Sequence, residues 1–178
     1  MKSRNLLLFL VLSVAACQEI HGDCPEITDI TPNSAGAVEE VEISGHHFAL
    51  GHQDLWGDGA QAVPPQVWLD ISLRNSIPPE LESMFTPEDL AAMAAMDMSL
   101  EADQVVFESG ELLRVTTPDL SWSDIETGAT MMGASIPTLP ANLPFPLAST
   151  VRVINPSECE SAWDGDFFLI ITTPPEGQ

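Results

Sequence analysis

Alternation of apolar and polar residues predicts a chain built mainly from β-strands. Val41 and Ile43 alternate with polar residues over positions 40–44, which is the period-2 pattern of a strand with one buried face. The segment Gln66–Ser72 repeats this pattern. Further strands are expected at Ile27–Ile30, Leu112–Pro118, Ser149–Pro156 and Asp166–Thr172. The fold class indicated by the pattern is all-β.

Two stretches between these strands predict insertions, at about 75–103 and 119–148. In the first, Thr86 can cap a helix, Pro87 suits its first turn and Asp89 completes a capping-box-like start, so we expect a short helix. In the second, Gly128–Ala148 contains prolines spaced too closely for a helix or a central strand. We therefore expect Gly128–Ala148 to lie over the surface in extended form.

The N-terminal residues have the pattern of a secretory signal. Lys2 and Arg4 precede an apolar run, Leu6–Val14, that is shorter than the roughly 20 apolar residues needed to span a bilayer. The sequence V-A-A-C ending at Cys17 resembles the lipobox of bacterial lipoproteins. The resemblance implies removal of residues 1–16, a diacylglycerol on the Cys17 thiol and a further acyl chain, such as palmitate, on its amine. Several chains anchor a protein stably. An ordinary signal peptide is the alternative.

Residues 17–23 are expected to form a polar tether between this anchor and a single domain at 24–178. The residue after Cys17 is Gln18. In enterobacterial lipoproteins an aspartate at that position usually retains the protein at the inner membrane, so the resemblance implies the outer membrane. We therefore expect a lipid-anchored protein of the bacterial cell envelope.

Charge narrows the possible partners. Removing residues 1–16 leaves 162 of the 178 residues, with three arginines and no lysine against 27 acidic residues, and a formal net charge of 3 minus 27, or −24. Nucleic-acid binding requires cations that displace counterions from phosphates, so this function is excluded. The acidity is compatible with solubility alone, with basic partners or with divalent cations.

Two motifs lie near the start of the mature chain, P-x-I-x-x-I-x-P and V-x-I-x-G-x-x-F. Their defined positions are Pro25, Ile27, Ile30, Pro32, Val41, Ile43, Gly45 and Phe48. They resemble the immunoglobulin-like IPT/TIG family, whose repeats commonly start with the first motif and continue into the second. The segments Leu112–Pro118 and Ser149–Pro156 are similar to the fifth and sixth strands of the family. The resemblance implies an immunoglobulin-like β-sandwich that acts as a binding or structural module.

The cysteines are expected to divide into one lipidated residue and one disulfide. If Cys17 carries lipid, Cys24 and Cys159 remain as a pair in an oxidising compartment. In a sandwich of immunoglobulin topology, the start of the first strand and the loop between the sixth and seventh strands lie at the same end. Cys24 and Cys159 fall on those two places, so we predict that they form a disulfide. Two separate thiols or intermolecular pairing are the alternatives.

A loop rich in histidine and aspartate is the candidate metal site. Imidazole and carboxylate groups are possible ligands for zinc or another divalent ion, although the spacing matches no established site. The candidates are His46, His47, His52, Asp54 and Asp58. A calcium variant would combine Asp54 and Asp58 with Asp164 and Asp166. Because His46 and His47 fill the two variable positions of the G-x-x-F motif, they are most simply interpreted as turn residues at a strand end. No other cofactor is indicated.

Enzyme signatures are missing from the sequence. It has no G-x-S-x-G elbow, no H-E-x-x-H helix and no phosphate-binding glycine loop. We therefore expect a non-catalytic, lipid-anchored module that binds an envelope or surface protein. The alternatives are a divalent-metal-dependent binding module using the His/Asp loop and, third, a hydrolytic envelope enzyme with a perturbed carboxylate or histidine in a pocket.

Overall fold

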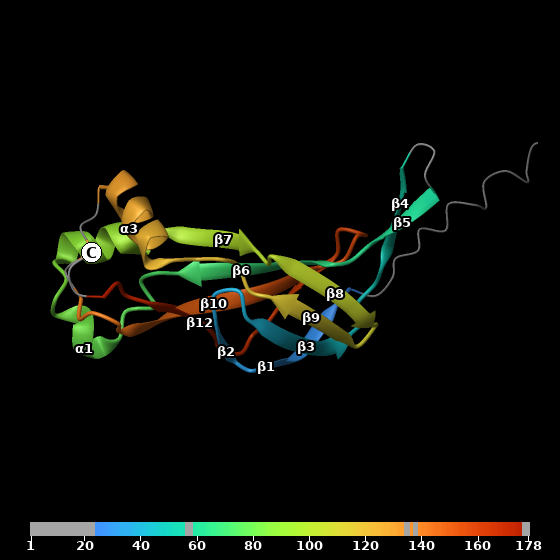
Figure 1. Ribbon diagram of the computed structural model, residues 1–178, viewed down its shortest axis with the longest axis horizontal. Helices are drawn as coiled ribbons and strands as arrows, with labels where there is room; N and C mark the ends of the chain where they lie inside the picture. The colour runs from blue at the N-terminus through green and yellow to red at the C-terminus, as the bar shows by residue number, and fades with distance from the viewer. Residues whose placement is uncertain (1–23, 56–58, 134–135, 137–138, 176–178) are drawn as a thin grey trace, which may run out of the picture.

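A computed structural model describes residues 24–55, 59–133, 136 and 139–175, and it is a sandwich of two β-sheets (Figure 1). The four-stranded sheet has the order β1 (Glu26–Thr31), β3 (Glu40–His46), β9 (Leu112–Thr116) and β8 (Gln104–Ser109). The six-stranded sheet has the order β2 (Ser34–Gly36), β12 (Phe167–Thr172), β10 (Pro144–Ile154), β6 (Gln66–Ser72) and β7 (Asp97–Glu101), and β11 (Glu160–Ala162) also pairs with β10. The expected all-β sandwich is confirmed.

The strand order is that of an immunoglobulin-like sandwich. In chain order, β1, β3, β8 and β9 correspond to strands A, B, D and E of one sheet, while β6, β10 and β12 correspond to C, F and G of the other. A separate hairpin, β4 (Gly51–Leu55) and β5 (Gly59–Val63), lies in the connection between β3 and β6. The strands expected from the alternating pattern are therefore present.

The two sheets enclose one hydrophobic cluster. Side chains from β1 and β3 meet those of β6, β10 and β12, because every second residue of each strand points inward. Its most deeply buried members are Ile43, Val67, Leu69, Leu113, Val115, Val153 and Phe167. The apolar motif residues of β1 and β3 therefore contribute to this core.

A second cluster lies where the six-stranded sheet extends beyond the four-stranded one. There the inner face of the sheet is covered by helices α1 (Pro79–Glu82), α2 (Pro87–Ala94) and α3 (Trp122–Met131) (Figure 1). Strands β6, β10 and β12 form the sheet side of this cluster. Their buried residues there are Ile71, Phe145, Leu147, Leu169 and Ile171. Trp122 of α3 packs edge-on against Phe145, with ring centroids 5.5 Å apart. The helices thus complete the sandwich and cover a core.

The first insertion contains the expected capped helix. Thr86 accepts a hydrogen bond from the Asp89 backbone N–H, and the Asp89 carboxylate accepts one from the Thr86 N–H, which is a capping box for α2. The same insertion also contains α1 and strand β7, which pairs with β6 as an edge of the six-stranded sheet. These two elements were not predicted.

The second insertion differs from the prediction of extended surface chain. Its first part forms α3, and its last part, with Pro144 and Pro146, begins the long strand β10. The Ala148 N–H donates to the hydroxyl of Ser76, on the side of β10 that faces β6. Because the backbone nitrogens of alternate residues point to the same side of a strand, the nitrogens of Pro144 and Pro146 also face that side. The pairing of β6 with β10 starts only at Ser149, so these prolines interrupt no ladder bond. This explains how they occur in a central strand.

Candidate functional site

Several loops gather at one end of the sandwich, which we call the loop end. It comprises the start of β1, the β4–β5 hairpin, the β8–β9 turn and the β10–β11 loop. In immunoglobulin variable domains, connections at this end carry the recognition loops. The opposite end, which we call the helix end, carries α1–α3 and the last described residues after β12 (Figure 1).

A disulfide joins two elements of the loop end. Cys24, two residues before β1, is bonded to Cys159 in the β10–β11 loop, with a Cα–Cα distance of 5.2 Å. This confirms the predicted pairing. Because the two residues are 135 positions apart in sequence, the bond holds the start of the domain against its last third.

A buried asparagine connects two further loops. Asn155 is 3% exposed, and its side-chain amide donates to the carbonyl oxygen of His47 at 2.7 Å. Its side-chain oxygen accepts from the N–H of Ala49 at 3.1 Å. The backbone N–H of Asn155 donates to the carbonyl of Cys159 at 2.9 Å. The loop end is therefore held together by one covalent bond and by a network centred on Asn155.

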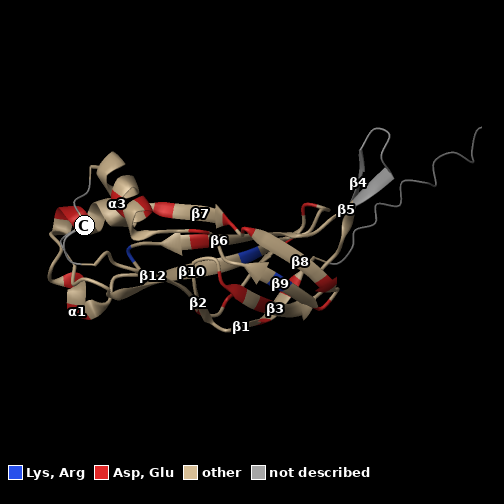
Figure 2. Cartoon of the chain, in the orientation of Figure 1, with Lys and Arg blue, Asp and Glu red and all other residues tan. Residues whose placement is uncertain are grey.

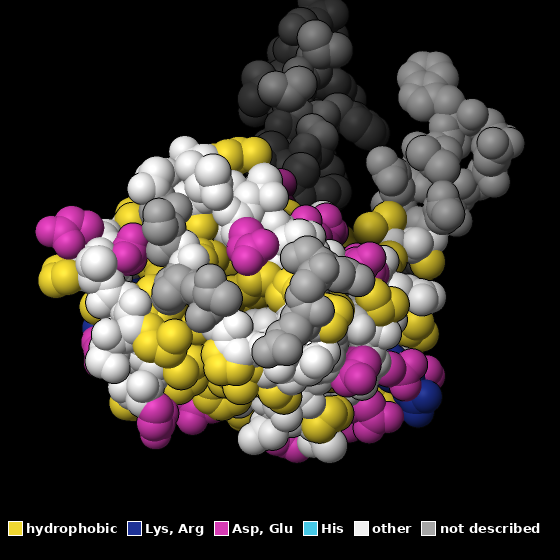
Figure 3. Space-filling view, turned by 60° about the vertical axis from the view of Figure 1, so that its left-hand side comes forward, with side chains coloured by type: hydrophobic (Ala, Val, Ile, Leu, Met, Phe, Trp, Pro, Cys, Tyr) yellow, Lys and Arg dark blue, Asp and Glu magenta, His cyan; other side chains and the backbone are white. Residues whose placement is uncertain are grey.

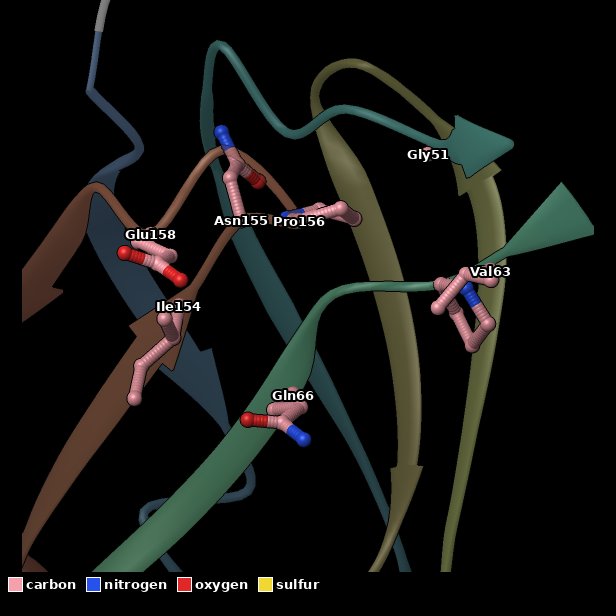
Figure 4. Close-up of a pocket in the computed structure, with 8 residues that line it drawn as sticks. Gly51, Val63, Gln66, Ile154, Asn155, Pro156 and Glu158 are labelled. Atoms are coloured by element: carbon pink, nitrogen blue, oxygen red, sulfur yellow. The ribbon is translucent and has the colours of Figure 1, made fainter. Parts of the chain in front are cut away.

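A shallow cleft of about 360 Å³ lies between the β4–β5 hairpin and the β10–β11 loop (Figure 4). Gly51 and Val63 border it on the hairpin side, and Asn155, Pro156 and Glu158 on the other. A Cβ atom at Gly51 would lie 2.5 Å from the Pro156 Cβ, so glycine is needed for this close approach. Among the described residues that line the cleft, Glu158 is the one titratable side chain.

The histidine and aspartate candidates are only partly described. His46 and His47 are exposed at the end of β3, with ring centroids 6.2 Å apart and tilted by 58°. The backbone of His52 and Asp54 lies in β4, but their side chains, and Asp58 altogether, fall outside the described residues. Asp164 and Asp166 are exposed in the β11–β12 connection. Among the described residues no group of three or more His, Cys, Asp or Glu side chains could hold a metal ion. The metal hypothesis stays a prediction.

Polar grooves of about 490 and 460 Å³ cross the outer face of the six-stranded sheet. Both contain Asp70 of β6 and Thr150 of β10. Residues 163–166 form one wall of the groove of about 490 Å³. They bulge between β11 and β12, because the Trp163 N–H donates to the carbonyl of Val151 while Phe167 already pairs with Ser149.

An ion pair lies at these grooves: Asp70 lines both, and its partner Arg152 lines the groove of about 460 Å³. The guanidinium of Arg152 donates to both carboxylate oxygens of Asp70, and its third nitrogen donates to Glu160 at 3.2 Å. The hydroxyl of Ser99 also donates to Asp70. The hydrogen bond from Arg152 is the largest cause that lowers the pKa of Asp70 below its usual range, and Asp70 raises the pKa of Arg152 in turn. Asp70 is therefore ionised near neutral pH and unsuited to act as a general acid.

Replacing Asp70 with asparagine is expected to cost about 1 kcal/mol of unfolding free energy at pH 7, because the pair is partly exposed, with side chains 26% and 33% accessible, and is screened by solvent. The folded pKa lies below the unfolded one, so the stabilisation is full above about pH 4 and is lost as pH falls through the folded value. Urea unfolding of wild type and D70N between pH 7 and 3 should show a difference that shrinks in acid. D97N, on the neighbouring strand β7, is the control. A pH-independent difference would contradict this explanation.

Two parts of the site were missed by the sequence analysis, and each had a signal. An Asn-Pro dipeptide such as Asn155-Pro156 is a local turn signal, but it does not indicate that the asparagine side chain is buried and bonded to a distant loop. Asp70 and Arg152 lie on predicted strands, and once those strands pair, Arg152 stands opposite Trp68 and diagonal to Asp70. Knowledge of the strand pairing would have identified the ion pair.

Comparisons with known proteins add no relative. No protein-family model matches the chain, and no curated protein shows significant sequence similarity to it. The functional interpretation therefore depends on the chain's own sequence and geometry.

Proposed function

We propose that this protein is a lipid-anchored component of the bacterial cell envelope, at the outer membrane, whose immunoglobulin-like sandwich acts as a non-catalytic binding or structural module. The anchor is Cys17, in the lipobox-like sequence that ends the N-terminal signal. The binding partner is an envelope or surface protein, and nucleic acid is excluded by the charge. None of the helices among the described residues is long and apolar enough to cross a membrane.

The observation that carries the proposal is the disulfide between Cys24 and Cys159. Disulfides form and persist in oxidising compartments such as the periplasm and the cell surface, which supports export. The bond also consumes two of the three cysteines. Cys17, seven positions before Cys24, is left as the single thiol of the chain and the one available for lipid.

We further infer that the sandwich is of the IPT/TIG type. The two motifs that resemble this family fall on β1 and β3, which pair with each other. Within them Ile27, Ile30, Val41, Ile43 and Phe48 are buried in the core between the sheets. The family resemblance and the observed strand order support the same class of module, whose loops and sheet edges are available to a partner.

Replacing Cys17 with serine tests the anchor. In cells that express the full chain, we expect wild-type protein in the membrane fraction and the C17S variant in the soluble exported fraction, because the acyl chains are lost. Mass analysis of the wild-type N-terminal peptide should show the diacylglycerol and the amide-linked chain. E111S, an exposed substitution that keeps both Cys17 and the disulfide, is the control and should stay membrane-bound. An unmodified Cys17, or a C17S protein that remains in the membrane, would refute the proposal.

A further inference from the structure

The disulfide fixes the place at which the N-terminal segment leaves the domain. Cys24 is bonded to Cys159, and from Glu26 onward β1 is paired with β3. The chain is thus held at two successive points, one covalent and one by backbone hydrogen bonds. Fraying of β1 cannot move the exit point away from the loop end.

The tether beyond this point is short compared with the domain. Seven positions separate Cys17 from Cys24, and at about 3.3–3.6 Å per residue a fully extended tether reaches roughly 25 Å. Strand β10 runs from the helix end to the loop end, and its 11 residues rise roughly 36 Å at about 3.3 Å each. A lipid on Cys17 therefore keeps the loop end close to the bilayer, and the tether cannot reach round to the helix end.

The charge distribution opposes a domain that lies flat on the membrane. After Cys17 the chain has three basic side chains other than histidine, and each is in an ion pair. Arg74 pairs with Glu82, Arg114 lies within 4 Å of three glutamates, and Arg152 binds Asp70 and Glu160. Acidic residues are spread over both sheets and the helices (Figure 2). No face offers uncommitted arginine or lysine to anionic headgroups, whose negative potential repels carboxylates.

We infer that the protein stands end-on, with the loop end facing the lipid headgroups and the helix end presented away from the membrane; this inference rests on the proposed anchor at Cys17. A partner that approaches from the far side then meets α1–α3 first. That end shows apolar side chains among acidic ones (Figure 3), and Met131 at the end of α3 is 80% exposed. The loop end corresponds in position to the recognition loops of antibodies, but in this orientation it faces the lipid.

Energy transfer to the membrane surface measures this orientation. A fluorescent non-natural amino acid replaces either Glu111, exposed in the β8–β9 turn at the loop end, or Met131 at the helix end. The full chain is placed on vesicles of phosphatidylethanolamine and phosphatidylglycerol (3:1) that contain a headgroup-linked acceptor. One preparation uses protein extracted from envelopes. The other uses unprocessed, oxidised chain whose single free thiol, Cys17, is coupled to a maleimide lipid.

We expect severalfold greater transfer from position 111 than from position 131 in both preparations, because the two sites are separated by roughly the length of β10. Equal transfer would show a domain lying flat, and greater transfer from 131 would show the reverse orientation. Either result overturns the inference. The coupled preparation reports orientation even if mass analysis finds natural Cys17 unmodified, so failure of the anchor and failure of the orientation are distinguishable. Repeating the measurement on vesicles without phosphatidylglycerol removes the anionic lipid, so the excess of transfer from position 111 that remains there is due to the tether geometry alone.

Discussion

Replacing both Cys24 and Cys159 with serine is expected to lower the free energy of unfolding by about 4 kcal/mol. The bond closes a loop of 135 residues, and in the chain-entropy model a cross-link of this span restricts the unfolded chain by roughly 4–5 kcal/mol. Domains of this size are typically stable by only about 5–15 kcal/mol, so the variant is expected to be marginal at growth temperature. Urea unfolding of the exported protein, monitored by tryptophan fluorescence, measures the loss.

The single variants C24S and C159S serve as matched controls for this effect. Each removes the same bond, so each should lose nearly the full amount, and the double variant should lose little more. Reduction of the wild type with dithiothreitol should give the same decrease, whereas C17S, which leaves the bond intact, should not. A loss under about 1 kcal/mol on reduction would mean that the unfolded chain is already restricted without the bond.

Replacing Gly45 with alanine is expected to destabilise the fold by about 3 kcal/mol, in the upper range for overpacking. Gly45 lies in β3 opposite Ile27 of β1. A Cβ atom there would overlap the backbone carbonyl oxygen of Glu26 and lie 2.6 Å from Cζ of Phe48. Neither neighbour can withdraw easily, since one is strand backbone and the other is a buried ring. The measurement is the denaturant midpoint of the purified variant.

Gly110 provides the matched control for this substitution. It lies in the β8–β9 turn next to the backbone of Phe48, but a Cβ atom there would be 3.5 Å from the carbonyl oxygen of Phe48, an ordinary contact. G110A is therefore expected to change stability by less than about 1 kcal/mol. If G45A proved as mild as G110A, the close approach of β1 to β3 would not be what requires glycine in the G-x-x-F motif.

Strands with one buried face were predictable because their periodicity is local. Gln66–Ser72 and the Val41–Ile43 region show the alternation, and both form strands with inward apolar side chains. The capping box of α2 was likewise visible because its two residues are three positions apart. Local patterns of this kind need no knowledge of the remaining chain.

Other elements depend on distant contacts and were not predictable in the same way. Pro144 and Pro146 argue against a central strand, and they fit only because β6 pairs further along β10. Helix α3 exists at a place where the six-stranded sheet has an uncovered apolar face for Trp122 and Ile125 to bury. The Asn155 network joins residues more than a hundred positions apart. Such features follow from topology rather than from neighbouring residues.

The helical cover of the second cluster has a consequence for how the molecule opens. The disulfide and the Asn155 network both secure the loop end, while α1–α3 are held over the extended sheet chiefly by apolar contacts. We therefore expect the helices to detach from the sheet more readily than the strands at the disulfide-bonded end separate. When the helices detach, the parts of β6, β10 and β12 beneath them stay hydrogen-bonded to one another, but their apolar inner face is no longer covered. A neighbouring chain can then contact this apolar face of a sheet that is otherwise native.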